Sequence, residues 1–555
     1  MCETDGSGFR KTTGEHPSRI LGPETLSQAV PLWYTDGLWR SEMDLQGKRI
    51  YLVGIKGTGM ASLAILLSHA GAVVGGCDTS EVFATDALLA EASISWDVGF
   101  HASLLPRDVA LVVHSSAWKD ESCPVLAEAK RKRIDTLSYP QMLARMSREC
   151  TCYAVAGTHG KTTTTGCAAW LLSRPNRKAF PFFALYGAAA QSADGHPQTA
   201  GVWQGDEVGL LEACEYQDHF LSYAIRGALV TTVEHDHPDY FPNLQTVKRS
   251  FQQFVSQLAQ RGFLICCFDD PGARELAGWA KMHRPDLMVV TYGYHEHGPF
   301  GIRNASSLWC GVVPRGMSSF EISLLAGKCF YSPLFGRELT DDIVGAALLA
   351  SCILLDRPDP RLFLKEDSLI CDEILATVMG DMLGDLVDFK GCIGRCEVLL
   401  ESDGVTYIDD YAHHPTEISA TIASLRLRFP GRPVVVAFSP HTASRSKAYF
   451  NDFVSALSQA DRVVVQSTYA SARKDISQDG DIAKDLADAI SRRMLRSART
   501  KVQSVIYAEN DGQAAKILSG WLQRDDLCIT MGAGNNRALS WSVARLRDEN
   551  RPNKS

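Results

Sequence analysis

Short apolar runs rich in β-branched residues recur along the chain, and stretches of helical length separate them. The first series contains KRIYLVGI, GAVVGGCD and DVALVVHSS, and the second contains CYAVAG, VGLLEA, GALVTTV, GFLICCF and LMVVTYG. A third series begins near Gly394 with VTYIDD and continues through PVVVAFS, DRVVVQS, VQSVIYA and LCITMGAG. Such runs, bounded by turn residues, are typical of buried strands, and their alternation with helices indicates parallel sheets. The pattern therefore predicts an α/β protein of three domains.

The same pattern divides the chain into four segments. Residues 1–45 are polar and rich in turn formers, and we interpret them as an N-terminal extension. The three series of strands predict domains over residues 46–138, 139–393 and 394–555. A length of 555 residues fits this division, because domains usually contain ~100–200 residues.

Composition and charge exclude several classes of protein. Hydrophobic residues make up 45% of the chain and charged residues 22%, which are ordinary values for a globular protein. The net charge of −8 gives no general attraction to nucleic acid or to an anionic membrane, and no run of ~18 apolar residues could span one. The N-terminus lacks the apolar core of a signal peptide, and the 16 cysteines show no spacing that indicates a disulfide framework. We expect a cytoplasmic protein without a nucleic-acid or membrane partner.

The segment VAGTHGKTTTTG, residues 155–166, has the composition of a phosphate-binding loop. A strand ends at Val155, glycines allow the chain to turn, and a helix begins near Thr162. Backbone amides in such a turn favour phosphate oxygens, and Lys161 would reach the β- and γ-phosphates. A turn that merely joins a strand to a helix would explain the glycines but not the Lys-Thr pair with three further threonines. The predicted nucleotide-binding residues are Gly157, Thr158, His159, Gly160, Lys161, Thr162 and Thr163.

A magnesium ion would need oxygen ligands beside these phosphates. The Thr162 hydroxyl is one candidate, and Glu212 is a second because it follows an apolar run in the same domain. Glu212 could also be a surface acid at the end of a strand. Further on, TTVEHDHPDYF gathers acids and histidines after another strand, namely Glu234, His235, Asp236, His237 and Asp239. This cluster fits a metal site or a solvated loop, and its place at the carboxyl end of a strand favours the site.

The first domain contains its own glycine-rich turn, VGIKGTGMASLA, between a strand and a helix. Gly54, Gly57 and Gly59 follow the spacing G-x-x-G-x-G rather than the dinucleotide fingerprint G-x-G-x-x-G, which weakens a dehydrogenase interpretation. The turn would still allow a diphosphate to approach the backbone, and Asp78 could bind a ribose hydroxyl. A tight turn without a ligand is the alternative.

The third domain places polar residues after two of its strands. In YIDDYAHHPTEI, Thr416 and the glutamate that follows it could cap a helix, whereas His413 and His414 lie in a polar turn where a core role is difficult to assign. In FSPHTASRS, His441 and Arg445 follow another strand, and an arginine there suits a carboxylate or a phosphate.

In this order, these segments resemble the Mur ligase family. The blocks that carry the resemblance are GIKGTGM, HSSAW, GTHGKTTTT, EACEYQDHFL, EHDHPDY, DDYAHHPTEI and MGAG, and they extend from about Lys48 to Asn536. GTHGKTTTT and DDYAHHPTEI are specific by themselves, and the whole set in register makes a chance match implausible. The resemblance implies Rossmann-like first and third domains on either side of a central domain similar to P-loop ATPases.

The resemblance is strongest to family members that join L-alanine to UDP-N-acetylmuramate, and it implies an ATP- and Mg²⁺-dependent ligase of peptidoglycan precursor synthesis. The sugar carboxylate would attack the γ-phosphate to give an acyl phosphate, and the amine of L-alanine would then attack that group. Residues 46–138 would bind the UDP-sugar, residues 139–393 ATP, and residues 394–555 the amino acid.

The resemblance also assigns roles to individual residues. The catalytic residues would be Lys161, Glu212, His237, Arg395, His414 and Arg445, and the Mg²⁺ ligands would be Thr162, Glu212 and His237. The UDP-sugar would contact Gly57, Thr58, Gly59, Asp78, Ser115 and Ser116. His413 and His441 would contact substrate, His413 or His414 would position the amine or take its proton, and Arg445 would hold the carboxylate of the amino acid.

Several positions depart from the family pattern. Where the family has a histidine and two asparagines at the adenine, the segment FGRELTDDIVG has Glu338, Leu339 and Asp342. A pair of arginines is reduced to Arg395, and Thr442 replaces another arginine. The phosphate and metal groups are kept, whereas the contacts to adenine and to the amino acid are altered.

Three alternatives stay open at this point. One is a sister ligase that adds another amino acid or a peptide to the same sugar. Another is a weakly active or non-catalytic paralogue that binds UDP-sugar and nucleotide, and the third is a nicotinamide oxidoreductase, which only the first glycine loop supports. The sequence leaves the oligomeric state open between a monomer and a weak dimer.

Overall fold

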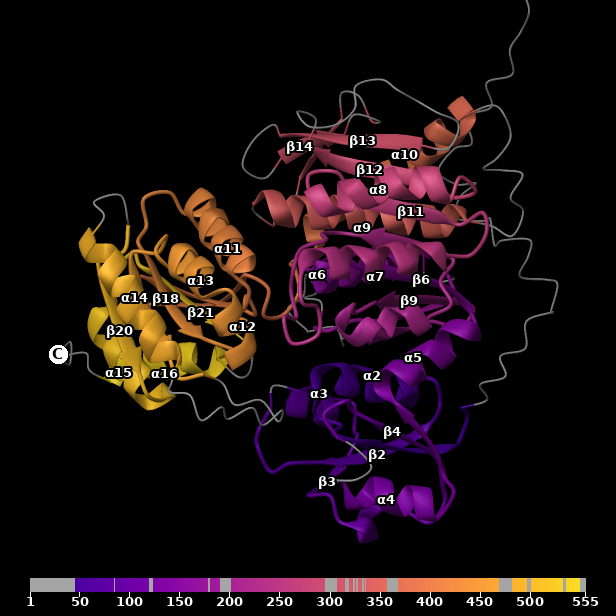
Figure 1. Ribbon diagram of the computed structural model, residues 1–555, viewed down its shortest axis with the longest axis horizontal. Coiled ribbons are helices and arrows are strands. Elements are labelled where there is room, and N and C mark those ends of the chain that lie inside the picture. Colours follow the sequence, from indigo (N-terminus) through magenta and orange to yellow (C-terminus); the bar gives the residue numbers. More distant parts are fainter. Residues whose placement is uncertain are drawn as a thin grey trace, which may run out of the picture.

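The computed structural model describes residues 45–549 except 84, 119–122, 178–179, 190–200, 295–306, 315–318, 323–324, 326–327, 332–333, 335, 357–367, 469–481, 497–500 and 533–535. The chain folds into three α/β units, as the strand pattern predicts. In Figure 1 the first unit (indigo) lies below the central unit (magenta), and the C-terminal unit (orange and yellow) lies beside it. The predicted extension 1–45 lies outside the described residues except for Leu45.

The first sheet has five parallel strands in the order β3-β2-β1-β4-β5. The strands are β1 (Arg49–Val53), β2 (Val73–Asp78), β3 (Trp96–Val98), β4 (Val109–His114) and β5 (Asp135–Ser138). The helices are α2 (Thr58–His69), α3 (Thr85–Glu91), α4 (Pro124–Arg131) and α5 (Tyr139–Arg148). The strand order reverses between β1 and β4, so the glycine turn after β1 lies at the switch point where such sheets bind ligands.

The central sheet has ten strands in the order β15-β14-β13-β12-β11-β10-β6-β9-β7-β8. They are β6 (Thr151–Ala156), β7 (Phe182–Leu185), β8 (Gly201–Trp203), β9 (Val208–Glu212), β10 (Gly227–Val230), β11 (Phe263–Cys267), β12 (Met288–Tyr294), β13 (Ser307–Pro314), β14 (Ser319–Ile322) and β15 (Cys329–Tyr331). The strands from β13 to β7 are parallel, and β8, β14 and β15 pair in the antiparallel sense at the two edges. The sequence pattern does not mark these short edge strands, because too few of their residues are buried to form an apolar run.

The central helices include α6 (Lys161–Leu172), α7 (Leu244–Ser256), α8 (Pro271–His283), α9 (Arg337–Leu355) and α10 (Ser368–Asp385). Asn243 and Asp270 cap α7 and α8 through their side chains, which explains where these helices begin. α6 has no such cap at its start, because Gly160 stands there with a φ of 80° and leaves the first amides of the helix available.

The C-terminal sheet has six strands in the order β16-β17-β21-β18-β19-β20, and β16 is its one antiparallel member. The strands are β16 (Glu397–Ser402), β17 (Val405–Asp410), β18 (Val434–Ser439), β19 (Arg462–Gln466), β20 (Ser504–Ala508) and β21 (Leu527–Gly532). The helices are α11 (Pro415–Arg428), α12 (Ala443–Ala448), α13 (Phe450–Leu457), α14 (Ile482–Arg496), α15 (Asp511–Trp521) and α16 (Arg537–Glu549). The carboxyl ends of β17 and β18 face the central unit, so the loops that carry His413 and His441 lie there (Figure 1).

The hydrophobic cores divide the chain differently from the sheets. One core contains Leu63 and Leu66 of α2 together with Phe183 and Leu185 of β7, and thus joins the first and central units. The two units approach so closely that a Cβ at Gly201 would lie 3.5 Å from the Leu66 Cβ. The cores of the C-terminal sheet contain no described residue from outside that unit. The first and central units therefore share apolar packing that the C-terminal unit does not.

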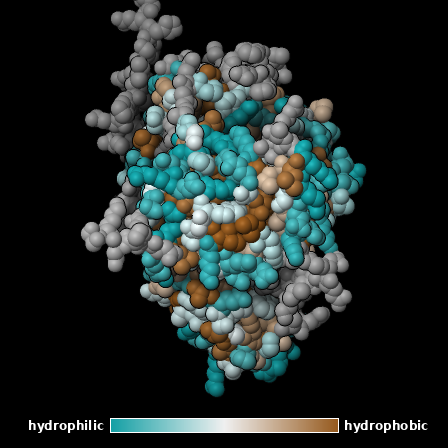
Figure 2. Space-filling model, turned by 90° about the vertical axis from the view of Figure 1, so that its left-hand side faces the viewer, coloured by the Kyte–Doolittle hydropathy of each residue, from teal (hydrophilic) through white to brown (hydrophobic). Residues whose placement is uncertain are grey.

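Hydrophilic residues cover most of the face that carries the C-terminal unit, and hydrophobic residues gather near its middle (Figure 2). Among the described helices, none is both long and apolar enough to cross a membrane. The cysteines whose side chains the structure describes are all free thiols.

Candidate active site at the junction of the three units

The segment GTHGKT forms a tight turn between β6 and α6. Gly157 has a φ of 138°, and a Cβ there would collide with the Thr231 hydroxyl, so this position requires glycine. A Cβ at Gly160 would in turn collide with the Asp342 carboxylate. The turn thus presents the N-terminus of α6 to a cavity, which is the arrangement that favours phosphate oxygens.

The side chain of Lys161, at the start of α6, folds back and contacts the loop. Its ammonium donates to the carbonyl oxygens of Gly157 and Thr158 and to Glu215, whose Oε2 is 2.9 Å away. Burial works to lower the pKa of Lys161, but the Glu215 carboxylate outweighs it and raises that pKa above its ordinary value. Glu215 is 1% exposed and holds a cation in the cavity. This residue lies within the segment EACEYQDHFL, and the sequence pattern predicted no role for it.

Thr162, Glu212 and Arg395 meet beside this loop. The Thr162 hydroxyl lies 3.0 and 3.1 Å from the two oxygens of Glu212, and the Arg395 guanidinium donates to the same hydroxyl over 3.3 Å. The Gly187 amide donates to Glu212 Oε2 over 2.7 Å and orients the carboxylate. A hydroxyl and a carboxylate side by side are hard oxygen donors of the kind that Mg²⁺ prefers.

The cavity in front of the loop has a volume of about 920 Å³ and is lined by all three units. Of the predicted residues, its described lining includes Thr158, His159, Gly160, Lys161, Thr162, Thr163, Glu212, His237, Arg395, His413, His441 and Arg445. From the first unit it includes Ala117, next to the predicted Ser115 and Ser116. Gly157, His414 and the first glycine turn do not belong to the described lining.

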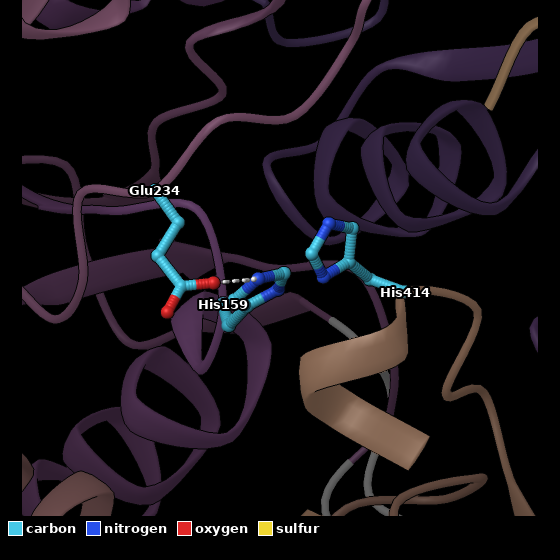
Figure 3. A group of neighbouring side chains, drawn as sticks. All are labelled: His159, Glu234 and His414. Carbon is cyan, nitrogen blue, oxygen red and sulfur yellow. Dashed lines mark ion pairs between the residues drawn. The ribbon is translucent and has the colours of Figure 1, made fainter. Parts of the chain in front are cut away.

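His159 connects the phosphate loop to the C-terminal unit. Its Nδ1 lies 3.0 Å from Glu417 Oε1, and its Nε2 lies 3.3 Å from Glu234 Oε2. Figure 3 shows His159 between Glu234 and the ring of His414, whose centroid is 4.7 Å away. Burial opposes a charge on His159, but the two carboxylates outweigh it and raise its pKa to about 10. Three potential metal-ligand atoms of His159, Glu234 and His414 lie within 4.8 Å of one another, but a protonated ring has no lone pair for a metal ion.

His413 and His414 differ in what they can offer to a substrate. Burial lowers the pKa of both rings to about 4, so both are neutral near pH 7. Nδ1 of His413 lies 3.0 Å from the Tyr411 carbonyl oxygen and therefore carries the proton, which leaves Nε2 as an acceptor. Nδ1 of His414 instead accepts from the Thr416 amide over 3.4 Å and caps α11. His413 lines the cavity, and His414 is 5% exposed behind it.

Arg445 of α12 is paired across the interface with the central unit. Its Nε and Nη2 donate to the two oxygens of Asp236 over 2.9 and 3.0 Å. Burial opposes ionisation of Asp236, but Arg445 outweighs it and lowers the pKa of that carboxyl below its usual range. The family resemblance implies that Arg445 holds a substrate carboxylate, and two of its donor groups, Nε and Nη2, are already hydrogen-bonded to Asp236. His237 lies next to this pair, with Nε2 3.8 Å from Glu215 Oε1.

In the first unit, the structure gives Asp78 a supporting role. Its two carboxylate oxygens accept from the amides of Lys56 and Thr79, each over 2.7 Å, and hold the glycine turn against β2. Each carboxylate oxygen keeps further lone pairs, so the contact to a ribose hydroxyl stays a prediction. A Cβ at Gly59 would lie 2.9 Å from Cζ of Tyr139, so Gly59 is needed where α2 passes α5.

The first turn of α9 places acids in the lining of the cavity. Glu338, Leu339, Asp341 and Asp342 all line it. Thr164 donates to Asp342 Oδ1 over 3.2 Å, and burial raises the pKa of Asp342 to about 8. Oδ1 of Asp341 is buried and has no partner among the described residues. The three positions singled out in the sequence are thus brought beside the phosphate loop.

Comparison with known proteins identifies the family. Residues 49–150 match the Mur ligase family, catalytic domain; residues 155–332 match the Mur ligase middle domain; and residues 394–534 match the Mur ligase, glutamate ligase domain. The chain is 34% identical over 496 residues to a UDP-N-acetylmuramate–L-alanine ligase of Treponema pallidum, covering 89% of this chain and 96% of that protein. The chain belongs to the Mur ligase family.

Further relatives agree with this assignment. A UDP-N-acetylmuramate–L-alanine ligase of Borreliella burgdorferi is 31% identical over 500 residues, with 88% of this chain and 97% of that protein covered. The solved UDP-N-acetylmuramate-alanine ligase of Thermotoga maritima shares the fold, with a TM-score of 0.63 and 19% identity over 91% of this chain and all of that one. This Mur ligase is therefore an ATP-dependent amino-acid ligase of peptidoglycan synthesis, as the motifs imply.

Proposed function

We propose that this Mur ligase joins L-alanine to the carboxylate of UDP-N-acetylmuramate through an acyl phosphate, in the cytoplasm. The observation that carries the proposal is the single cavity in which the phosphate loop, Arg395 and the loops of the C-terminal unit face one another. The proteins of Treponema pallidum and Borreliella burgdorferi with this named activity resemble the chain over nearly their whole length.

The two ends of the cavity suit the two phosphorylated substrates. The UDP-sugar would enter from the first unit, residues 46–138, because Ala117, which follows the predicted Ser115 and Ser116 in sequence, lines the cavity there. ATP would lie on the loop of the central domain, residues 139–393, with its base toward the first turn of α9. The amino acid would bind to the domain formed by residues 394–555.

The donor set beside the loop fits Mg²⁺. Thr162 and Glu212 supply hard oxygen ligands, and Glu215 Oε1, which is buried and accepts no hydrogen bond within the described part of the chain, lies 3.8 Å from His237. Thr162, Glu212 and His237 would hold the ion, and the bound ion would offset negative charge on the phosphates.

Lys161 and Arg395 would stabilise charge while the sugar carboxylate attacks the γ-phosphate. A carboxylate that approaches a triphosphate meets electrostatic repulsion, and two fixed cations in a buried site counter it without reorganisation. Contacts among the three units would exclude water from the acyl phosphate, which otherwise hydrolyses.

Among the histidines, His413 is better placed than His414 to assist the amine. His413 lines the cavity, and its Nε2 is free of a proton, so it can accept a hydrogen bond from an attacking amine. The carboxylate of the amino acid would bind the Nη1 side of Arg445, near His441, because Asp236 holds the other side. The loss of an arginine at Thr442 should relax the selectivity, so that glycine or L-serine is also accepted.

The direct test is phosphate release with UDP-N-acetylmuramate, Mg-ATP and each of the twenty amino acids in turn. We expect release to depend on L-alanine, and weaker release with glycine or L-serine. A product of the mass of the sugar nucleotide joined to alanine confirms ligation. Release with another amino acid alone indicates a sister ligase, and no release with any of them indicates a non-catalytic paralogue.

A further inference from the structure

A closed ring of polar contacts joins the phosphate loop to the start of α11. His159 contacts Glu417 through Nδ1 and Glu234 through Nε2, at 3.0 and 3.3 Å. The Thr416 hydroxyl donates to the same oxygen of Glu234 over 3.0 Å and closes the ring. The side chains of His159, Glu417 and Glu234 are 11%, 19% and 35% exposed, so water screens these contacts only in part.

Each glutamate in the ring makes a second contact. Glu417 Oε2 accepts from the amides of His413 and His414 over 2.9 and 3.2 Å, and thereby fixes the turn that carries both histidines. The Glu234 amide donates to the Thr158 hydroxyl over 2.9 Å, which ties Glu234 to the phosphate loop. The ring therefore links the loop that faces ATP to the turn that faces the amine.

The backbone of His159 is held independently of its ring. Its amide donates to the Thr232 hydroxyl over 2.8 Å, and its carbonyl oxygen accepts from the Thr231 hydroxyl. A change at the side chain should leave these loop contacts in place. Both ring nitrogens face carboxylates: Nδ1 is hydrogen-bonded to Glu417, whereas Nε2 forms an ion pair with Glu234 and makes no hydrogen bond within the described part of the chain.

We propose that His159 is a positioning residue that fastens the C-terminal domain onto the phosphate loop, rather than a ligand of the nucleotide. The inference rests on the proposed ligation. Among the described residues, the interface carries no shared apolar core, so this charged ring and the Arg445–Asp236 pair contribute much of what holds the domains in register. Without His159, the competent arrangement would be populated less, which raises the apparent KM for the amino acid more than it lowers kcat.

His159→Gln tests this role. A glutamine amide can donate to one carboxylate but carries no charge, so Glu234 and Glu417 would repel each other across the interface. We expect the KM for the amino acid to rise about 10-fold, with kcat and the KM for ATP within about threefold of the parent. The radius of gyration from small-angle scattering of the full chain without substrates should increase. His283→Gln makes the same change at an exposed site on α8 and should alter none of these quantities.

Glu417→Gln supplies the decisive comparison, because glutamine keeps the capping contacts to the amides of the turn. In the parent, this change should raise the KM for the amino acid. In the His159→Gln background it should lower that KM, because it removes the repulsion. The proposal is overturned if the fold-changes in KM from the two substitutions simply multiply in the double variant. It is also overturned if His159→Gln raises the KM for ATP instead, or leaves the radius of gyration unchanged. If the proposed ligation is wrong, the parent protein will be inactive in the phosphate-release assay. His159→Gln will still increase the radius of gyration, so the two failures can be told apart.

Discussion

At the scale of single residues, two buried side chains in the site carry charges that only their neighbours make tolerable. Lys161 is 13% exposed at its side chain and pairs with Glu215, which is 2% exposed there. Removing one member of such a pair leaves an uncompensated buried charge, whereas removing both charges does not. Lys161 thus pairs within the fold and is also the proposed phosphate ligand, and the two roles can be separated by experiment.

We predict that Lys161→Met lowers turnover ~10²–10³-fold and the free energy of unfolding by ~3 kcal/mol or more. The double variant Lys161→Met with Glu215→Gln should regain much of the stability but none of the turnover. Urea unfolding and phosphate release measure the two effects. Lys248→Met, which breaks a pair with Glu275 on the surface, is the control. Recovery of turnover in the double variant would show that Lys161 does not act on the phosphates.

Asp342 should make stability fall as the pH rises. Its folded pKa of about 8 lies above the unfolded value of 3.8, so the folded state holds a proton that the unfolded state has lost. Stability is lost progressively between about pH 4 and pH 8, at up to ~1.4 kcal/mol per pH unit. Asp342→Asn should therefore match the parent near pH 4 and exceed it at pH 8. Unfolding curves at several pH values without nucleotide measure this, and parallel curves for both proteins contradict it.

At the scale of elements, the first turn of α9 should make base selectivity the weakest feature of the enzyme. Leu339 offers no side-chain hydrogen bond, and a carboxylate at Glu338 can only accept, whereas the histidine and asparagine expected there from the family also donate. Losing two bonds should raise the KM for ATP about 10-fold with kcat largely kept. The double variant Leu339→Asn with Asp342→Asn should restore a low KM for ATP. Comparing kcat/KM for ATP, GTP and UTP measures the effect. A parent that prefers ATP by more than ~10³-fold would mean that the adenine contacts are intact.

At the scale of the whole molecule, the division of the cores predicts two unfolding units. The first and central units share a core, so they should unfold together, while the C-terminal unit should unfold separately. A non-hydrolysable Mg-ATP analogue at 100 times its Kd should stabilise the unfolding unit formed by the first and central units by ~2.7 kcal/mol. Scanning calorimetry with and without the analogue measures both effects. One transition in all conditions, or three, would contradict the division.

Much of the architecture follows from the sequence because it depends on local patterns. Buried parallel strands require apolar runs, and a phosphate loop requires glycines with a lysine and a threonine at fixed spacing, so these features are visible without a structure. The sequence pattern did not predict the edge strands β8, β14 and β15, because short and partly exposed strands leave no run of apolar residues. Lys161, Glu212 and Arg395 line one cavity, as the order of the motifs suggested, and their roles there stay predictions.

The tertiary structure alone decided which side chains pair across the units. Asp236 and Arg445 are 209 residues apart in sequence, and His159 and Glu417 are 258 apart, so no local spacing marks either pair. The folded chain also places the amides of Lys56 and Thr79 on the Asp78 carboxylate and makes His414 a helix cap, because the Thr416 amide points at its ring. The sequence by itself determined the fold and the family, since these depend on patterns within each element. The partners, protonation and tasks of the charged groups depend on how separate domains meet, and only the folded chain specifies that.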